Sequence, residues 1–202
     1  MAKPREESIR TFVCIEVPAS IKERIDALQR ELRRIDAQVS WAKSPNIHLT
    51  LKFLGDIAAS RMERVRDAVE RAAAEIDPFD IEVGGAGCFP SAHNPRVVWV
   101  GLTQVPEPLA TFNARLEDEL AGEGIARESK RFSPHLTIGR VRTPRNARRL
   151  AETLIASGFE AESFRATEVI VMRSELNPQG AVYSPQAVIA FPSPSGHNRA
   201  LS

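Results

Sequence analysis

The stretches "HLTLKFLG" (residues 48–55) and "HLTIGRV" (residues 135–141) share one pattern, His-Leu-Thr followed by an apolar residue. The chain has 4 histidines in 202 residues, so half of them occupy the same place in this short pattern. Both stretches are rich in apolar residues and bounded by Pro or Gly, which is typical of β-strands. Because residues i and i+2 of a strand face the same side, each His shares a face with its Thr, opposite the leucine.

The chain around the two motifs repeats with them. Sequence positions 48 and 135 differ by 87, and so do the positions of Phe12 and Trp99, each in a strand that precedes a motif. Leu28 and Leu116, in the apolar periodicity of the two intervening helices, lie 88 positions apart. An offset that persists through strand, helix and motif indicates an internal duplication.

The pattern of apolar residues predicts the order strand, helix, motif strand, helix, strand in both copies. Strands are expected at residues 10–17, 48–54, 79–87, 96–102, 135–141, 167–174 and 181–191, and helices at 20–35, 60–76, 108–120 and 146–157. Pro185 inside the last segment predicts an edge strand or a bulge there, because proline has no N–H for a central ladder.

We therefore expect an α+β fold, formed by a single bilobal domain over residues 1–202. The internal repeats would cover about 10–95 and 96–191, with a flexible C-terminal tail at 192–202. Each copy has few strands, so the two copies should pack as lobes of one body. The expected arrangement is a pseudo-two-fold pair of mixed or antiparallel sheets that face a central cleft, with helices on the outer faces.

Charge is balanced overall but uneven along the chain. The 27 Lys and Arg against 26 Asp and Glu give a net charge of +1, so no overall field points to nucleic acid. Between Arg127 and Arg149 there are 8 basic residues and a single acid, Glu128. This stretch surrounds the second motif, and it indicates either a local anion-attracting surface or an ordinary solvated face.

Other features limit the possible class of protein. No apolar run resembles a signal peptide or reaches the length of a membrane span. The two cysteines, Cys14 and Cys88, lack the spacing of a metal or redox motif, which is consistent with a reducing compartment. We expect a cytoplasmic protein that acts as a monomer and does not bind a membrane.

Two imidazoles and two hydroxyls that meet across a cleft suit one kind of chemistry. A neutral and a protonated His can act as general base and general acid in the same turnover. Thr hydroxyls can donate to phosphoryl oxygens. A duplication kept only for packing would explain the leucines but not the repeated His and Thr. Neither motif has a neighbouring third ligand at metal spacing, so we expect no metal and no cofactor.

The motifs and their flanks resemble those of the two-histidine (2H) phosphoesterases, and within them the RNA 2′,3′-cyclic phosphodiesterases, also called 2′-5′ RNA ligases. The resemblance covers roughly residues 9–191 and rests on four segments in order: "W…SPNIHLTLKFLGD", "GCFP…PRVVWVGL", "FSPHLTIGRV" and "GAVYSPQAVIAFP". It implies metal-independent hydrolysis of a terminal 2′,3′-cyclic phosphate to a 2′-phosphomonoester, with reversible 2′-5′ ligation of RNA ends, including tRNA fragments, as a related process.

The resemblance also implies roles for individual residues. His48 and His135 would be the acid–base pair, and Thr50 and Thr137 would bind the phosphate. Arg140 matches an arginine of the family's second motif.

Strand alternation adds expectations of its own. It places Arg140 opposite to His135, so a bend near Gly139 is needed to bring it to the phosphate. Lys52 should share the face of His48 and is a further phosphate-binding candidate, while Phe89 is a candidate for base stacking.

Two other functions remain open from the sequence. The chain could be a 2H phosphodiesterase that acts on a small cyclic nucleotide, or an RNA-end-binding module without turnover. A long basic surface leading from the cleft favours RNA, and a closed pocket favours a small molecule. The near-symmetry of the motifs leaves open which histidine is the acid and which is the base.

Overall fold

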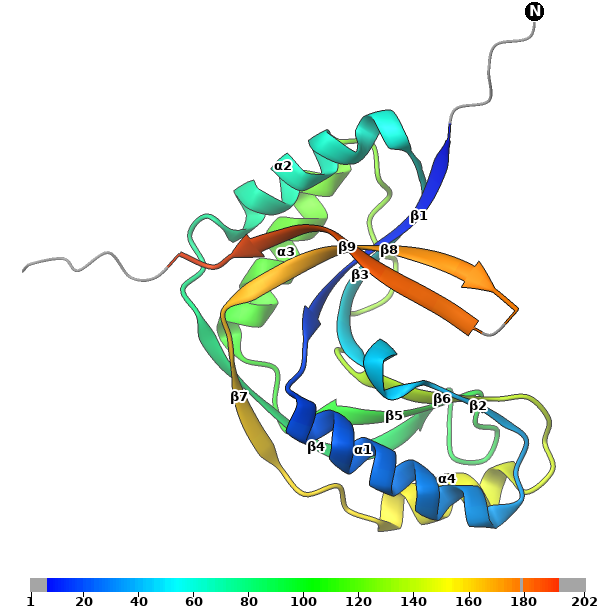
Figure 1. Ribbon diagram of the computed structural model, residues 1–202. Helices are drawn as coiled ribbons and strands as arrows, with labels where there is room; N and C mark the ends of the chain where they lie inside the picture. Colours follow the sequence, from blue (N-terminus) through cyan, green and yellow to red (C-terminus); the bar gives the residue numbers. More distant parts are fainter. Residues whose placement is uncertain (1–6, 179, 193–202) are drawn as a thin grey trace, which may run out of the picture.

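The computed structural model describes residues 7–178 and 180–192, and its strands form one curled antiparallel sheet flanked by helices (Figure 1). The predicted tail at 192–202 therefore lies, apart from Pro192, outside the described residues. The strands are β1 (Ser8–Glu16), β2 (Val39–Trp41), β3 (His48–Ala58), β4 (Phe79–Phe89), β5 (Val97–Leu102), β6 (Leu136–Val141), β7 (Glu162–Ala166), β8 (Glu168–Asn177) and β9 (Gly180–Ala190). The α-helices are α1 (Ala19–Leu32), α2 (Met62–Ala73), α3 (Glu107–Gly122) and α4 (Ala147–Ala156), and short 3-10 helices occupy Arg33–Ile35, Ser44–Asn46 and Ala59–Arg61.

The strand order is β7-β4-β5-β6-β3-β1-β8-β9, with β2 paired to β6. The expected α+β class is confirmed. The structure refines one detail, because the two expected sheets are two halves of one continuous sheet, β7-β4-β5-β6 and β3-β1-β8-β9. A single register pair, Leu49 with Leu136, joins them. One pair is enough for continuity but allows the two halves to curl apart on either side of it.

Each half of the sheet takes strands from both parts of the sequence. β4 belongs to the first predicted repeat but pairs with β5, whereas β8 and β9 belong to the second and extend the half built on β1 and β3. A lobe is therefore not the same unit as a sequence repeat, and the duplication itself stays a prediction. β9 lies at the edge of the sheet, and its register shifts beside Pro185, as the sequence predicts.

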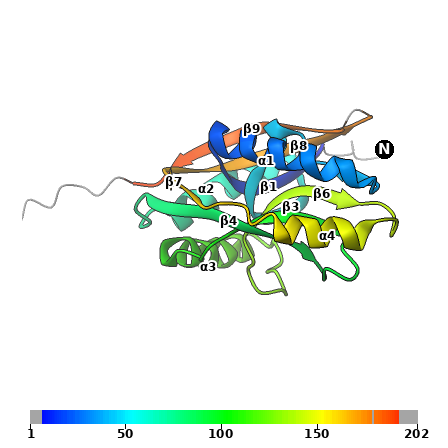
Figure 2. The same ribbon diagram turned by 90° about the horizontal axis from the view of Figure 1, so that it is seen from below.

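The helices cover the sheet in two pairs (Figure 1). α1 packs against α4 beside β4, and α2 packs against α3 beside β9. Seen from below, α3 lies on the opposite side of the molecule from the β8–β9 hairpin (Figure 2). The periodic face predicted for α1 is buried at Ile21, Ile25, Leu28 and Leu32. No helix within the described ranges is long and apolar enough to cross a membrane.

Two strands, β2 and β7, are absent from the sequence expectations because they are only 3 and 5 residues long, too short for a pattern to be recognised. β4 also runs on to Phe89, although its pairing with β5 is irregular between Val83 and Ala86. A Cβ at Gly87 would lie 2.5 Å from the Trp99 ring on the neighbouring strand. This glycine therefore makes room for a close side chain and does not end the strand.

Both motif strands contain a β-bulge at the same place. Against β1, the register of β3 changes between Lys52 and Thr50, so that Leu51 is an extra residue. Against β5, the register of β6 changes between Gly139 and Thr137, so that Ile138 is extra. These two bulged residues also lie 87 positions apart in the sequence. A bulge shifts the strand by one residue and so reverses which face the following side chains occupy.

The junction between the two halves gives a stability prediction. Leu136 is fully buried at the single joining pair, so Leu136→Ala should lower the free energy of unfolding by about 2–5 kcal/mol through lost burial and a residual cavity. Urea unfolding measures this loss. The matched control is Leu176→Ala, since Leu176 is 73% exposed and should cost less than about 0.5 kcal/mol. Equal losses in the two variants would contradict a packed junction.

Candidate active site

A cleft of about 770 Å³ opens between the two halves of the sheet. Predicted site residues His48, Thr50, Thr137 and Arg140 line it. Its other charged lining residues are Arg10, Lys43 and Arg142, and none of the described residues that line it is acidic. The charged side chains that line the cleft are thus all basic, and such a lining attracts anions.

The joining pair of strands brings the two motifs together. Extending the Leu49–Leu136 register by one position in each direction sets His48 opposite Thr137 and Thr50 opposite His135. Leu49 and Leu136 face the core and are fully buried, so alternation turns the four polar side chains to the other face, where they are half-buried. Although His135 is not among the residues that line the cleft, this register puts it on the same face as Thr50.

Aromatic rings hold each imidazole. His48 stacks on Phe12 with ring centroids 4.7 Å apart, and Tyr183 of β9 meets it edge-on at 5.4 Å. His135 is met edge-on by Phe89 at 5.0 Å and lies 6.1 Å from Trp99. Phe12 and Trp99, the pair that shares the motif offset in the sequence, thus each lie beside one of the two histidines.

Backbone hydrogen bonds and burial set the protonation of the histidines. Nδ1 of His135 lies 2.7 Å from the carbonyl oxygen of Ser133. Since a carbonyl can only accept, Nδ1 carries the proton, which leaves Nε2 to exchange a proton with a substrate. His48 makes a corresponding hydrogen bond with the backbone of Asn46.

Both imidazoles are held in the neutral form near pH 7. Burial lowers the pKa of His48 from 6.5 to about 4. Burial also lowers the pKa of His135, a lowering that the Ser133 hydrogen bond opposes and the charge of Arg140 reinforces.

The bulge in β6 decides the position of Arg140. Without it, Arg140 would face away from His135, as alternation predicts. The extra residue Ile138 restores Arg140 to the cleft face, so the bend expected near Gly139 lies one residue earlier. The equivalent bulge in β3 turns Phe53, which lies 5 residues after His48, to the cleft in the same way.

Lys52 corrects one of the sequence predictions. Alternation placed it with His48 as a phosphate-binding residue, but the bulge at Leu51 turns it to the opposite face. The residue is 2% exposed, and its Nζ lies 2.7 Å from Glu117 Oε2 and donates to the carbonyl of Ala126 at 2.9 Å. A buried amine that is already paired with a carboxylate is not available to a substrate in the cleft.

The position of Phe89 also differs from its sequence prediction. The sequence suggested it for base stacking, but it does not line the cleft and packs against His135 and Trp99, with the Trp99 centroid 5.2 Å away. The large aromatic side chain exposed in the cleft is Phe53, at 56%. The sequence could have pointed to Phe53, because it follows His48 by 5 residues just as Arg140 follows His135. Tyr183 also lines the cleft; it belongs to the segment "GAVYSPQAVIAFP", but no role in the site was predicted for it.

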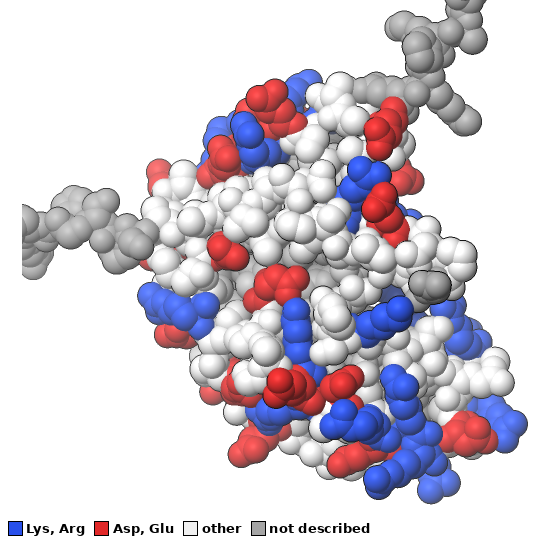
Figure 3. Space-filling view, viewed as in Figure 1, with Lys and Arg blue, Asp and Glu red and all other residues white. Residues whose placement is uncertain are grey.

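The basic stretch around the second motif divides between the cleft and the surface. Arg140 and Arg142 line the cleft, whereas Arg127, Arg145 and Arg148 pair with acids outside it. In the space-filling view, basic side chains gather over the end of α1, β2 and the adjoining end of β6, while α2 carries mixed charges (Figure 3). In the part of the chain that the structure describes, no three His, Cys, Asp or Glu side chains are grouped to hold a metal ion.

Comparison with known proteins now identifies the family. The RNA 2′,3′-cyclic phosphodiesterase of Methanothermobacter thermautotrophicus is 35% identical over 181 residues, which is 89% of this chain and 97% of that protein. The protein of the same description from Thermotoga maritima is 30% identical, over 87% of this chain and 91% of its own.

Solved structures agree. That of E. coli LigT complexed with 3′-AMP superimposes with a TM-score of 0.75 at 25% identity, over 92% of this chain and 99% of the other. A structure from Thermus thermophilus shares the fold at a TM-score of 0.75 and 21% identity, over 92% of this chain and 100% of that one. A family model also matches residues 17–178, and the chain therefore belongs to the 2′-5′ RNA ligase superfamily.

Proposed function

We propose that the protein is an RNA 2′,3′-cyclic phosphodiesterase that opens a terminal cyclic phosphate to a 2′-phosphomonoester. The observation that carries this is the placement of two His-x-Thr pairs on one face of a single cross-strand junction, beside a cleft whose lining among the described residues is cationic and has no acid. The descriptions of the relatives from M. thermautotrophicus and T. maritima support it.

The reaction needs one neutral and one protonated histidine. The neutral imidazole accepts a proton from water while the water oxygen bonds to phosphorus. The bond from phosphorus to the ribose 3′ oxygen breaks, and the second histidine donates a proton to that oxygen. The product carries a 2′-phosphate and a free 3′-hydroxyl. Binding of the anionic phosphate raises the pKa of the adjacent imidazoles, which favours protonation of the one that acts as acid.

The remaining polar side chains stabilise the phosphate. Thr50 and Thr137 stand opposite the histidines and can donate to the non-bridging oxygens, where charge increases in the transition state. Arg140 adds a planar cation that suits two phosphoryl oxygens. The described lining of the cleft offers an imidazole, hydroxyls and guanidiniums but no carboxylate, so we propose that the chemistry needs no metal ion.

RNA, more than a free cyclic nucleotide, fits the shape and charge of the cleft. Lys43 and Arg142 also line the cleft, and Arg142 donates from Nε to Ser40 Oγ at 2.6 Å. These groups suit the backbone phosphates that precede the RNA end. The exposed ring of Phe53 suits a nucleobase, in place of Phe89. We further propose a cytoplasmic monomer that acts on RNA ends such as tRNA fragments, with 2′-5′ ligation as the reverse reaction.

The central test is hydrolysis of an RNA oligonucleotide that ends in a 2′,3′-cyclic phosphate. His48→Ala and His135→Ala should each lower kcat by about 10²-fold or more, because each removes one proton-transfer group. The parent should release the 2′-phosphate isomer, and its activity should persist in excess chelator.

Each contrary result has a distinct meaning. A 3′-phosphate product would contradict the assigned reaction, and loss of activity with chelator would support a metal ion. Full activity in either histidine variant would remove that residue from the chemistry. Tight binding of the RNA end without turnover would favour the binding module.

The lowered pKa of His48 predicts a pH dependence of stability. Between pH 6.5 and about 4, His48 is protonated in the unfolded chain but not in the folded protein. The unfolded state therefore binds more protons, and stability falls as the pH drops through this window. His48→Gln should lose less stability across it than the parent, measured by urea unfolding at several pH values. Parallel curves for the two proteins would show that His48 is not held neutral by burial.

The proposed contact of Arg142 with the RNA backbone can be tested with Arg142→Gln. This change should raise KM for an RNA oligonucleotide and reduce the slope of log affinity against log salt by about 0.7, the value for one phosphate contact in a single strand. The same variant should treat a mononucleotide 2′,3′-cyclic phosphate as the parent does. The matched control is Arg148→Gln, whose arginine is paired with Glu152 outside the cleft. Equal effects on both substrates would favour a small-molecule esterase.

A further inference from the structure

Buried polar side chains gather behind the two motif strands. Among the described residues, the polar or charged side chains classed as buried are Thr11, Gln29, Lys52 and Asn113. Thr11 bonds within its own strand, to the carbonyl of Ile9. The other three all lie at the bulges of β3 and β6. Buried polar groups of this kind are uncommon and need their partners, so their concentration at one feature calls for an explanation.

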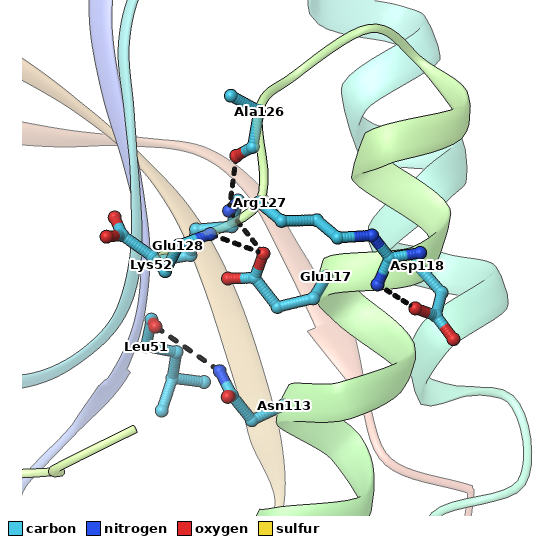
Figure 4. A network of polar contacts seen from close by, with 8 residues as sticks. All are labelled: Leu51, Lys52, Asn113, Glu117, Asp118, Ala126, Arg127 and Glu128. Carbon is cyan, nitrogen blue, oxygen red and sulfur yellow. Dashed lines mark hydrogen bonds and ion pairs between the residues drawn. The ribbon is translucent and has the colours of Figure 1, made fainter. Parts of the chain in front are cut away.

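The bulge in β3 is held from helix α3. Nδ2 of Asn113 donates to the carbonyl of Leu51, the bulged residue, at 3.3 Å in a buried position (Figure 4). A bulge interrupts the ladder and leaves backbone groups of the extra residue unpaired. Asn113 satisfies one of them in the core, where an unpaired carbonyl would be costly.

A side chain of helix α1 contacts the bulge in β6, where the carbonyl of Ile138 also accepts from the backbone N–H of Ala42 at 3.0 Å. Nε2 of Gln29 donates to the carbonyl of Ile138, again the bulged residue, at 2.9 Å, and to the carbonyl of Ala42 at 2.9 Å. Gln29 is 1% exposed, and its Oε1 makes no hydrogen bond to the described residues. A leucine would fill this place without burying an unpaired oxygen, so packing alone does not account for the amide.

An ion pair extends the support on the β3 side. Lys52, one residue after the bulge, pairs with Glu117 of α3 and also bonds Ala126 (Figure 4). Oε2 of Glu117 accepts in addition from the backbone N–H of Glu128 at 3.1 Å. Residues 126 and 128 belong to the loop that leads to His135. The same cluster thus connects the first motif strand to the approach of the second.

We propose that Gln29 and Asn113 are positioning residues, which hold the two bulges and thereby keep Arg140 and Phe53 turned to the cleft. They touch no substrate and act only through the motif strands. Gln29 acts on Thr137 and Arg140, which lie on either side of the bulge in β6. Asn113 acts on Thr50 and Phe53, which lie on either side of the bulge in β3. This inference rests on the proposed function, because its readout is the hydrolysis of the cyclic phosphate.

The first test compares kcat and stability in Gln29→Leu and Asn113→Leu. Each should lower kcat by about 10- to 100-fold, the effect of a displacement of about 1 Å in the reacting groups. Phe112→Leu is the matched control, since Phe112 is fully buried beside Asn113 on α3 but makes no polar contact with a bulge. It should lose stability with kcat close to that of the parent. If Gln29→Leu does not fold, Gln29→Met, which keeps an unbranched side chain of similar length and loses the donor, replaces it.

The second test asks whether Gln29 acts through Arg140. Gln29→Leu is measured alone and in an Arg140→Ala background. A positioning role predicts strong non-additivity, with most of the Gln29→Leu effect on kcat absent once Arg140 is gone. Additive effects, or a loss of kcat in Phe112→Leu that matches its loss of stability, would overturn the inference. A parent that leaves the cyclic phosphate intact would instead defeat the proposed function.

Discussion

The Leu49–Leu136 pair is the contact on which the rest of the structure depends. It is the single register pair between β3 and β6, and it makes one sheet of two halves that otherwise diverge. Its two side chains are fully buried, so they fix which face of each strand enters the core. The same constraint sends the histidines and threonines to the other face, where the divergence opens a cleft. The same strand pairing thus buries the two leucines in the core and turns the polar side chains toward the cleft.

The bulges provide the second constraint. A regular strand allows one residue in two to face the cleft, which would exclude Arg140. An extra residue after each threonine moves the third cleft-facing position on by one residue, from position 52 to Phe53 in one copy and from position 139 to Arg140 in the other. The two copies use the same backbone device but different side chains at this position. This asymmetry gives the cleft an aromatic surface on one side and a cation on the other.

The sequence predicted the parts of the site that depend on strand period and repetition. The pairing of His48 with Thr50 and of His135 with Thr137 follows from alternation over two residues, too short a span for a bulge to intervene. Phe12 and Trp99 were found through the offset, although their contact with the imidazoles was not foreseen. Lys52 was placed wrongly because the bulge at Leu51 reverses alternation beyond it, and a bulge leaves little signal in the residues that form it.

Long-range contacts account for what could not be predicted. Phe89 was a candidate for base stacking in a loop, with a hydrophobic packing role as the alternative, and β4 continues to it and packs it against His135. Tyr183 reaches the cleft because β9 extends the half of the sheet that holds β1 and β3, a pairing between distant parts of the chain. The sequence by itself determined the repeated motifs, the α+β class and the side chains proposed to carry the chemistry, because these follow from local periodicity. The tertiary structure decided which residues after each motif face the cleft, because that depends on bulges held by helices far away in the chain.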